Sequence, residues 1–312
     1  MSYFLGVDAG GTKTEFVLGD DERELARVRA GSIKRMRVSA EEAESNLRQA
    51  AGELELSTGV ALSTVAHCCI GAAGNTVPMV RDWLLKYVPL HVGGGLTVVN
   101  DVEIALDAAF AGGSGILVLA GTGSNVAGRS EEGVIVTAGG WGPALADQGS
   151  GHSLGLHALR RLFLAMDQQR SSSLLDTVLA SWHLNSIAEL VAYANRHPSP
   201  DFSQLAPLVA RAAEQGDSVA METIELEASE LAELVVLVLE RLREMDGPSL
   251  TVPRIAYTGS VISHVHLMRQ AVLRAVTSVY PSVDMLDAPA DPPLGALWRA
   301  RRECKAVSRV SA

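Results

Sequence analysis

Residues Gly6–Phe16 read GVDAGGTKTEF, in which a turn of glycines and hydroxyl residues lies between two apparent β-strands. A second turn of this kind, LAGTGSNVAG, follows about 110 residues later at Leu119–Gly128. Glycine lets the backbone approach a ligand closely and adopt positive φ, so successive N–H groups can converge on an anion. One such turn alone could be an ordinary hairpin turn. The repeat favours two phosphate turns, one from each half of the protein, that bind a single nucleotide from opposite sides.

The residues in and beside these turns suit phosphate and magnesium. The glycines, hydroxyl residues and lysine of the two turns are the candidate phosphate ligands: Gly10, Gly11, Thr12, Lys13, Thr14, Gly121, Thr122 and Gly123. Side chains alternate along a strand, so Lys13 is expected on the face opposite Thr12 and Thr14. Asp8 ends the strand beside the first turn and is placed to hold Mg²⁺ through water, because Mg²⁺ dehydrates reluctantly.

Two other glycine-rich motifs that bind nucleotides do not match this sequence. A Walker A loop that starts at Gly6 needs lysine where Thr12 stands, and it needs a helix after the turn. The run Thr12–Leu18 is instead rich in β-branched and aromatic residues, which predicts a returning strand. A dinucleotide-binding turn is excluded because Gly121 and Gly123 lack the third glycine and the helix that it requires.

Composition narrows the class of protein further. The 312 residues carry a net charge of −10 without a long basic block, so binding to bulk nucleic acid or to an anionic membrane is not expected. Cys68, Cys69 and Cys304 form no disulfide framework or CxxC motif, and the eight histidines lack the spacing of zinc ligands. The N-terminus lacks the basic region of a signal peptide, and the apolar helical run at 234–239 is too short to cross a bilayer. We expect a soluble, cytoplasmic protein.

The order of predicted elements indicates an α/β protein with two domains. Strands at 65–70 and 96–99 alternate with helices at 40–56 and 81–87, which argues for a mainly parallel sheet with polar site residues at its strand ends. In the second half we predict the hairpin 115–128, a strand at 134–137, helical scaffold over 171–244, a strand at 254–258, a turn at 259–261, a helix at 264–279, a strand at 283–286 and a last helix opened by Pro292.

Together these motifs resemble the actin-like, hexokinase-type ATP-binding fold, and within it the N-acetylglucosamine kinase and BadF/BadG-like ATPase family. The resemblance covers most of the chain, and Gly139–Gly142 (GGWG) with Asp147–Gly151 (DQGSG) is its most family-specific part. It implies a two-lobed, ribonuclease H-like α/β fold with a cleft between the lobes and a helical insertion in the C-terminal lobe. The expected lobes are residues 1–107, with the C-terminal helix 297–312 packing back on them, and residues 108–296.

The resemblance also assigns roles to particular residues. Tyr257–Val261 looks like the adenosine motif, with Gly259 and Ser260 at the nucleoside, and Asn100-Asp101 and Pro293–Leu297 look like the hinge-connecting segments. Phosphoryl transfer needs a base to accept the proton of the acceptor hydroxyl. Asp101 follows a strand and takes that role by resemblance. The alternative is that Asp101 merely caps the helix that begins there.

The acceptor site is expected at the family-specific loops. Trp141 would lay an apolar face on a sugar ring and Asp147 would accept hydrogen bonds from two hydroxyls, with Asn125 beside them. The alternatives are a core tryptophan and a helix cap at Asp147. Further candidates for the sugar site are Asn100, Asp101, Gly140, Lys34 and Gly74.

Two departures from the family pattern concern the acceptor. Typical members carry Asp-Glu-Gly-Ser, whereas Gln148 replaces the glutamate here. The loop Gly31–Arg37 (GSIKRMR) lacks the asparagine that the family usually offers to the sugar. Its cations Lys34, Arg35 and Arg37 suit a carboxylate or phosphate on the substrate, since arginine binds such groups bidentately. The alternative is a solvated basic loop.

The resemblance implies an ATP-dependent sugar kinase that uses Mg²⁺. Its acceptor would be an amino sugar, N-acetylglucosamine or glucosamine, or an acidic derivative such as N-acetylmuramic acid, and a homodimer is implied by the same likeness. One alternative is a BadF-type ATPase activator, which needs exposed cysteines to share an iron–sulfur cluster across a dimer, and Cys68 and Cys69 lie in a stretch that predicts a buried strand. The other is a non-catalytic sugar-binding regulator, which would bind sugar without releasing ADP.

Overall fold

The computed structural model describes residues 2–247 and 254–310. The chain divides into two compact units, Met1–Gly113 with Ala290–Ala312, and Ser114–Pro289. The sequence-based boundaries, after residues 107 and 296, lie a few residues from these. Residues 311 and 312 of the C-terminal helix expected from the sequence lie outside the described residues. The first unit is therefore built from two separate stretches of chain, and the second unit lies between them in sequence.

A five-stranded sheet forms the centre of the first unit. Its strand order is β3-β2-β1-β4-β5, in which β1 is antiparallel to β2 and parallel to β4, and β4 is parallel to β5. The strands are β1 (Tyr3–Ala9), β2 (Lys13–Gly19), β3 (Glu24–Gly31), β4 (Val65–Ala72) and β5 (Gly95–Val99). The predicted first hairpin is confirmed as β1–β2. The sequence-based reading missed β3, because charged residues such as Arg27 and Arg29 are typical of an edge strand and hide the apolar alternation.

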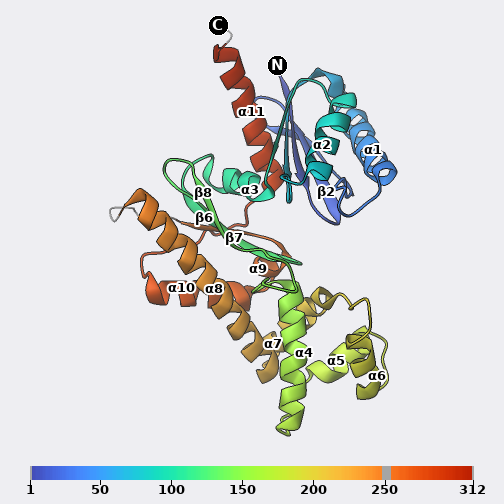
Figure 1. Cartoon of the computed structure of the whole chain (residues 1–312), viewed down its shortest axis with the longest axis vertical. Coiled ribbons are helices and arrows are strands. Elements are labelled where there is room, and N and C mark those ends of the chain that lie inside the picture. Colours follow the sequence, from blue (N-terminus) through green and yellow to red (C-terminus); the bar gives the residue numbers. More distant parts are fainter. Residues whose placement is uncertain (1, 248–253, 311–312) are drawn as a thin grey trace. The chain divides into compact units, whose positions relative to one another are not determined.

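Helices cover both faces of this sheet (Figure 1). They are α1 (Ala40–Thr58), α2 (Pro78–Tyr87), α3 (Asp101–Phe110) and α11 (Pro292–Val310), with 3₁₀ turns at Leu62–Thr64 and Val88–Leu90. On one face, the core joins β1 and β4 to buried residues of α1 and α2. On the other face, Phe4, Val17 and Cys69 pack with residues of α3 and α11. Cys68 and Cys69 are both buried, as predicted, and they point to opposite faces of β4.

Polar contacts fix α11 against α3. Arg299 donates from Nε to Asp107 at 2.6 Å and from Nη1 to Glu103 at 2.9 Å. Asp107 is buried, so this ion pair is shielded from water. The backbones also approach closely, because a methyl group at Gly295 would lie 1.8 Å from the carbonyl oxygen of Ile104. The C-terminal helix is thus an integral layer of the first unit.

The second unit contains a four-stranded sheet in the order β8-β7-β6-β9. Its strands are β6 (Gly115–Ala120), β7 (Ser124–Arg129), β8 (Ile135–Gly139) and β9 (Ile255–Thr258). The predicted hairpin at 115–128 is confirmed as the antiparallel pair β6–β7. The predicted strand at 283–286 is wrong, because Met285 makes an isolated bridge to Ile255 and no strand forms there.

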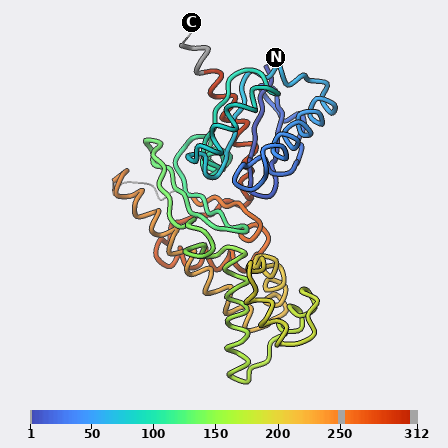
Figure 2. The backbone as a smooth tube through the Cα atoms, turned by 45° about the vertical axis from the view of Figure 1, so that its right-hand side comes forward, coloured from blue at the N-terminus to red at the C-terminus, as the bar shows by residue number. Residues whose placement is uncertain are grey.

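Helices make up most of the second unit. They are α4 (Gly151–Asp167), α5 (Leu174–Ser181), α6 (Ile187–Ala194), α7 (Ala206–Glu214), α8 (Ser218–Asp246), α9 (Ser260–His264) and α10 (His266–Val279), with a 3₁₀ turn at Phe202–Leu205. The carboxylate of Asp217 starts α8 by accepting the N–H groups of Val219 and Ala220. Buried residues recur three and four apart along α8 and pack against α4, α10 and the sheet. Figures 1 and 2 show α5 and α6 beside the end of α4 that points away from the sheet.

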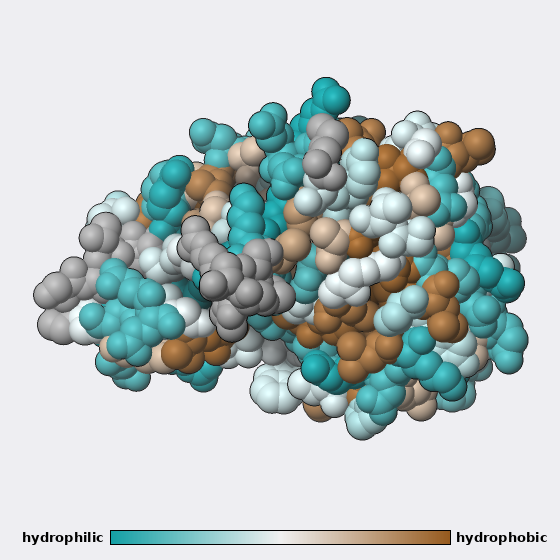
Figure 3. Space-filling view, turned by 90° about the horizontal axis from the view of Figure 1, so that it is seen from above, coloured by the Kyte–Doolittle hydropathy of each residue, from teal (hydrophilic) through white to brown (hydrophobic). Residues whose placement is uncertain are grey.

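The surface is mixed in polarity. The face in Figure 3 is mainly hydrophilic, with apolar residues gathered in smaller patches. Single large apolar side chains such as Leu56 and Leu90 are exposed, which is ordinary for a folded protein. Within residues 2–247 and 254–310, no helix combines the length and the apolar character that crossing a bilayer requires.

Candidate active site

The first phosphate turn joins β1 to β2. A methyl group at Gly10 would lie 2.7 Å from the carbonyl oxygen of Lys13, so the tight turn requires glycine there. Gly11 and Thr12 are exposed and available to a ligand. Lys13 is also exposed and its ammonium contacts Glu15 at 2.9 Å. Thr14, by contrast, is fully buried, and its hydroxyl accepts the N–H of Ile33 at 3.1 Å, so its hydrogen bond anchors the following loop.

The loop with the three cations lies against this turn. The Ser32 hydroxyl donates to the carbonyl oxygen of Gly10 at 2.9 Å. A methyl group at Gly11 would lie 3.5 Å from Nε of Arg37, and one at Gly74 would lie 3.6 Å from the sulfur of Met36. The loop is therefore held beside both the phosphate turn and the Gly74 turn, rather than extending freely into solvent.

Asp8 and Asp101 lie at the same edge of the first sheet. Asp8 is near the end of β1 and Asp101 follows β5, and parallel strands of one sheet place such residues together. The pKa of Asp8 is raised to about 7, mainly by burial and then by the negative charge of Asp101. Burial also raises the pKa of Asp101, and the positive charge of Lys34 partly offsets this rise. Lys34 is thus the cation of the loop whose charge acts on the predicted base.

Asn100 caps the helix that begins at Asp101. The Asn100 side chain accepts the N–H of Val102 at 3.1 Å, and Glu103 accepts the N–H of Asn100 at 3.1 Å, which completes a capping box. Asp101 occupies the first helical position, and its carboxylate also accepts the Val102 N–H at 3.0 Å. The cap is therefore provided by Asn100, so the alternative role of Asp101 as the capping residue is not needed.

The second phosphate turn joins β6 to β7 and contacts two further segments of its unit. The N–H groups of Gly151 and His152 donate to the carbonyl oxygens of Gly121 and Thr122, at 2.7 and 3.3 Å. A methyl group at Gly121 would lie 3.6 Å from the backbone nitrogen of Ser260. Gly259, with a φ of 98°, packs directly on Ala120 and Gly121. The structure thus brings the predicted phosphate turn and the predicted adenosine motif together.

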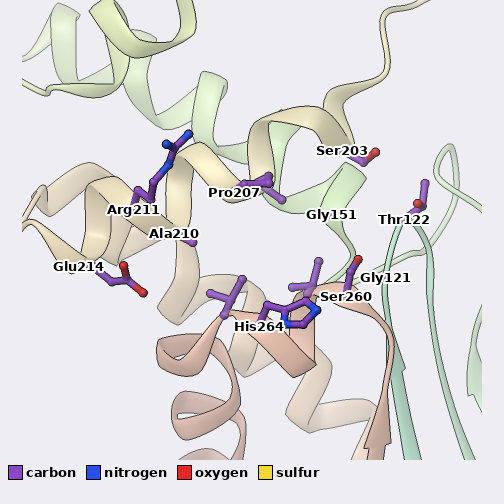
Figure 4. Close-up of a pocket in the computed structure, with 13 residues that line it drawn as sticks. Gly121, Thr122, Gly151, Ser203, Pro207, Ala210, Arg211, Glu214, Ser260 and His264 are labelled. Carbon is purple, nitrogen blue, oxygen red and sulfur yellow. The ribbon is translucent and has the colours of Figure 1, made fainter. Parts of the chain in front are cut away.

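A pocket of about 390 Å³ opens beside Gly121 and Thr122 (Figure 4). Its apolar wall comes from α7, α9 and the residue that follows α9, through Ala206, Pro207, Ala210, Val261 and Val265. Ser203, Arg211, Glu214, Ser260 and His264 add polar groups. In the view of Figure 4, Arg211 and Glu214 lie on the opposite side of the pocket from Thr122. Helical periodicity does not reveal which face of a helix borders a cavity, so the contributions of α7 and His264 to this pocket could not be predicted from the sequence.

The predicted sugar residues of the second unit also gather. The Asp147 carboxylate would lie 3.1 Å from a methyl group at Gly123, and the Asn125 side chain would lie 3.1 Å from one at Gly140. Trp141 is 74% exposed, so the alternative of a core tryptophan is wrong. The cap of α4 is Ser150, so the alternative of a cap at Asp147 is wrong as well.

Two polar atoms near this loop lack a protein partner. Oδ1 of Asn125 and Oε1 of Gln148 are buried, and neither has a hydrogen-bond partner in the described part of the chain. Buried polar atoms are normally hydrogen-bonded, so each unpartnered oxygen needs an explanation. A ligand rich in hydroxyl donors would supply the missing hydrogen bonds.

The carboxylates of the first unit suit Mg²⁺. No cluster of three or more histidine, cysteine, aspartate or glutamate side chains with metal-site geometry occurs in residues 2–247 and 254–310. Mg²⁺ is commonly held by one or two carboxylates together with water and substrate phosphates. Asp8, with Asp101 near it, provides such a donor set beside the first phosphate turn.

Comparison with solved structures identifies the fold. A structure from Chromobacterium violaceum, proposed to be an N-acetylglucosamine kinase, matches with a TM-score of 0.74 at 23% sequence identity, over 95% of this chain and 98% of that one. The chain has the actin-like ATPase fold that sugar kinases share, as predicted.

Sequence comparison then identifies the family. The family model of the BadF/BadG/BcrA/BcrD ATPases matches residues 5–300, and the chain belongs to this family. An N-acetylmuramic acid/N-acetylglucosamine kinase from Clostridium acetobutylicum is 29% identical, over 97% of this chain and all of that protein. An N-acetyl-D-glucosamine kinase from Dictyostelium discoideum is 27% identical, over 94% of this chain and 96% of that protein. The family resemblance found in the sequence is confirmed.

Proposed function

We propose that the protein is an ATP-dependent kinase that transfers the γ-phosphoryl group of MgATP to a hydroxyl of an amino sugar. The observation that carries the proposal is the second phosphate turn, which borders both the pocket and the Asp147 loop of its unit. A nucleotide with its base in this pocket would direct its phosphates to Gly121 and Thr122. The names of the relatives from Clostridium acetobutylicum and Dictyostelium discoideum support the same reaction.

The proposed chemistry divides among a few residues. Asp101 accepts the proton of the acceptor hydroxyl, and Asp8 holds Mg²⁺ through water. When bound, Mg²⁺ neutralises charge on the phosphates. We further propose that Gly10, Gly11, Thr12 and Lys13 bind phosphate together with Gly121, Thr122 and Gly123, while Thr14 acts indirectly through its hydrogen bond to Ile33. Gly259 and Ser260 border the nucleoside.

The proposed acceptor site uses the exposed ring of Trp141 and the polar groups of Asp147, Asn125 and Asn100. Sugar rings have apolar faces and polar rims, so an exposed tryptophan beside a carboxylate and an unpartnered amide oxygen suits them. Gly140 lets Asn125 approach the loop closely, and Gly74 borders the cation loop. We propose N-acetylglucosamine, glucosamine or an acidic derivative such as N-acetylmuramic acid as acceptor.

The burial of two cysteines weighs against an ATPase activator that shares an iron–sulfur cluster. The thiolate is the form that binds metal, and burial raises the pKa of Cys69 to about 12 and that of Cys68 well above its usual range. Both side chains lie in the core on β4. Neither is a suitable cluster ligand at neutral pH.

An ADP-release assay tests the proposed function. MgATP would be combined with hexoses, hexosamines, N-acetylhexosamines and acidic amino sugars, with Asp101→Asn as the background control. ADP release that depends on an amino sugar supports the proposal, and sugar-independent release or none contradicts it.

Because ATP is the proposed co-substrate, we place the protein in the cytoplasm. Light scattering during size-exclusion chromatography would test the homodimer that the family resemblance implies.

Trp141→Ala is expected to raise the KM for the sugar about tenfold, which corresponds to about 1.4 kcal/mol of lost binding. The KM for ATP should stay unchanged, because Trp141 is absent from the lining of the pocket beside Gly121. Leu145→Ala is a matched control, since Leu145 is also highly exposed on the same loop but offers no aromatic face. Steady-state kinetics with each substrate varied in turn would measure both constants. An unchanged sugar KM would remove Trp141 from the site.

Lys34→Ala is expected to raise the KM for N-acetylmuramic acid about tenfold relative to that for N-acetylglucosamine. The reason is that Lys34 would pair with the substrate carboxylate in addition to acting on Asp101. Arg35→Ala should have a smaller effect, because Arg35 already donates to the carbonyl oxygen of Val38. Lys86→Ala, a surface change on α2, is the control. If the ratio of the KM for N-acetylmuramic acid to the KM for N-acetylglucosamine equals that of the wild type, the cations of the loop do not bind the substrate carboxylate. The loop would then be a solvated basic loop.

A further inference from the structure

A carboxylate is buried among the helices of the second unit. None of the Glu227 side chain on α8 is exposed, and its neighbours on that helix, Ile224, Ala228 and Leu231, are buried too. Taking an ionised carboxylate out of water is costly unless hydrogen bonds and opposite charge replace the lost hydration. An apolar residue would occupy this position without that cost. The contacts of the carboxylate oxygens therefore need a separate explanation.

Both oxygens of Glu227 contact one stretch of chain. Oε2 accepts the backbone N–H of Gly149 at 2.8 Å, and Oε1 accepts the hydroxyl of Ser153 at 2.9 Å. Oε1 also contacts Nδ1 of His157. Glu227 thus ties α8 to the first two turns of α4 and to the loop that precedes α4.

That loop carries Asp147. Gly149 has a φ of 75°, and a methyl group there would lie 2.7 Å from the side chain of Leu231, so the loop backbone packs directly on α8. The carbonyl oxygen of Gln148 accepts the Ser124 hydroxyl at 2.7 Å, which joins the same loop to the start of β7. The peptide group between Gln148 and Gly149 is therefore held at both its carbonyl oxygen and its N–H, and Glu227 provides one of the two anchors.

We propose that Glu227 is a positioning residue for the acceptor site, which holds the Gly149 amide and thereby orients the Asp147 carboxylate toward the sugar. This inference rests on the proposed kinase function. Asp147 is two residues before Gly149, so a shift of the Gly149 amide changes where its carboxylate points. Glu227 does not touch the substrate and acts through the backbone of the loop.

The imidazole of His157 contacts the buried carboxylate. The hydrogen bond to Glu227 raises the pKa of His157, and burial and the charge of Arg160 oppose this rise. Glu230, one turn along α8, adds a further negative charge near the imidazole. The contact with Glu227 gives His157 a specific partner in the fold.

Three variants test the inference through kinetics. Glu227→Met keeps a similar volume but removes both oxygens, and Glu227→Gln keeps one oxygen that can accept the Gly149 N–H. Thr223→Val is the matched control, because Thr223 is equally buried one turn earlier on α8 and its hydroxyl donates within the helix, to Val219. Glu227→Met is expected to raise the sugar KM at least about tenfold with less than about a twofold change in the KM for ATP. Glu227→Gln should recover most of the loss, and Thr223→Val should match the wild type.

Hydrogen–deuterium exchange of segment 147–153 gives a readout that does not depend on turnover. Glu227→Met should speed exchange at Gly149 about tenfold, since the amide loses its acceptor, while Thr223→Val leaves it unchanged. Unchanged exchange, an unchanged sugar KM, or an equal rise in both KM values would overturn the inference. If the wild-type protein phosphorylates no sugar, the proposed function fails, and the exchange data still decide whether Glu227 anchors the loop.

Discussion

Asp101→Asn is expected to lower kcat for sugar phosphorylation by about 10²- to 10⁴-fold, the usual contribution of a general base. Asparagine has the same shape but cannot accept the proton of the acceptor hydroxyl. The fold should survive, because Asn100 and Glu103 cap α3 independently of residue 101. The measurement is ADP release at saturating sugar and ATP, with the melting temperature followed by circular dichroism.

Asp176→Asn provides the comparison for this variant. Asp176 occupies the first turn of α5, so its replacement makes the same chemical change at another helix N-terminus. Its kcat should equal that of the wild type. An Asp101→Asn protein that is folded and keeps more than about a tenth of the wild-type kcat would show that another group accepts the proton.

Gly295→Ala is expected to destabilise the first unit by about 3 kcal/mol, the upper end of the usual cost of overpacking. The new methyl group would lie 1.8 Å from the carbonyl oxygen of Ile104 and 2.6 Å from the backbone nitrogen of Ala108. Both are backbone atoms of α3, so no rotation of a side chain can relieve the overlap, and α11 must move away from its partner helix. Urea unfolding followed by circular dichroism would measure the loss.

Gly52→Ala is the control for this change. Gly52 lies inside α1, and a methyl group there meets no other atom within 4 Å. Because alanine favours the helix more than glycine does, this variant should be more stable by about 0.5–1 kcal/mol. Equal stability of Gly295→Ala and the wild type would contradict the close approach of α11 to α3.

Features encoded in short stretches of sequence could be predicted. The two glycine turns, the strands beside them and Asp101 after a strand all depend on neighbouring residues. Strand β3 could not be predicted, because its charged edge residues hide the alternation of apolar and polar side chains. The strand predicted at 283–286 does not form, and Met285 instead makes an isolated bridge to Ile255 of β9.

Features that depend on which helix faces which segment could not be predicted. The wall of the pocket on α7 and the contact from Glu227 to Gly149 join residues that are distant in sequence. Helical periodicity marks Glu227 as lying on a buried face but does not identify its partner. Similarly, the alternation of side chains along β2 predicts that Lys13 and Thr14 lie on opposite faces of the strand. It does not predict that the Thr14 hydroxyl accepts the N–H of Ile33, because that hydrogen bond depends on how the next loop packs.

The discontinuity of the first unit has a consequence for protein synthesis. α11 covers the sheet face formed by Phe4, Val17 and Cys69, yet the ribosome makes it after the whole of Ser114–Pro289. The second unit, whose residues are continuous, can thus fold while the nascent chain is still growing. Until α11 is made, α3 alone covers part of that apolar face of the first unit. A ribosome that stalls before Pro292 would therefore leave a folded second unit attached to an incomplete first unit with exposed apolar surface. Chaperones would be needed to keep such a chain from aggregating.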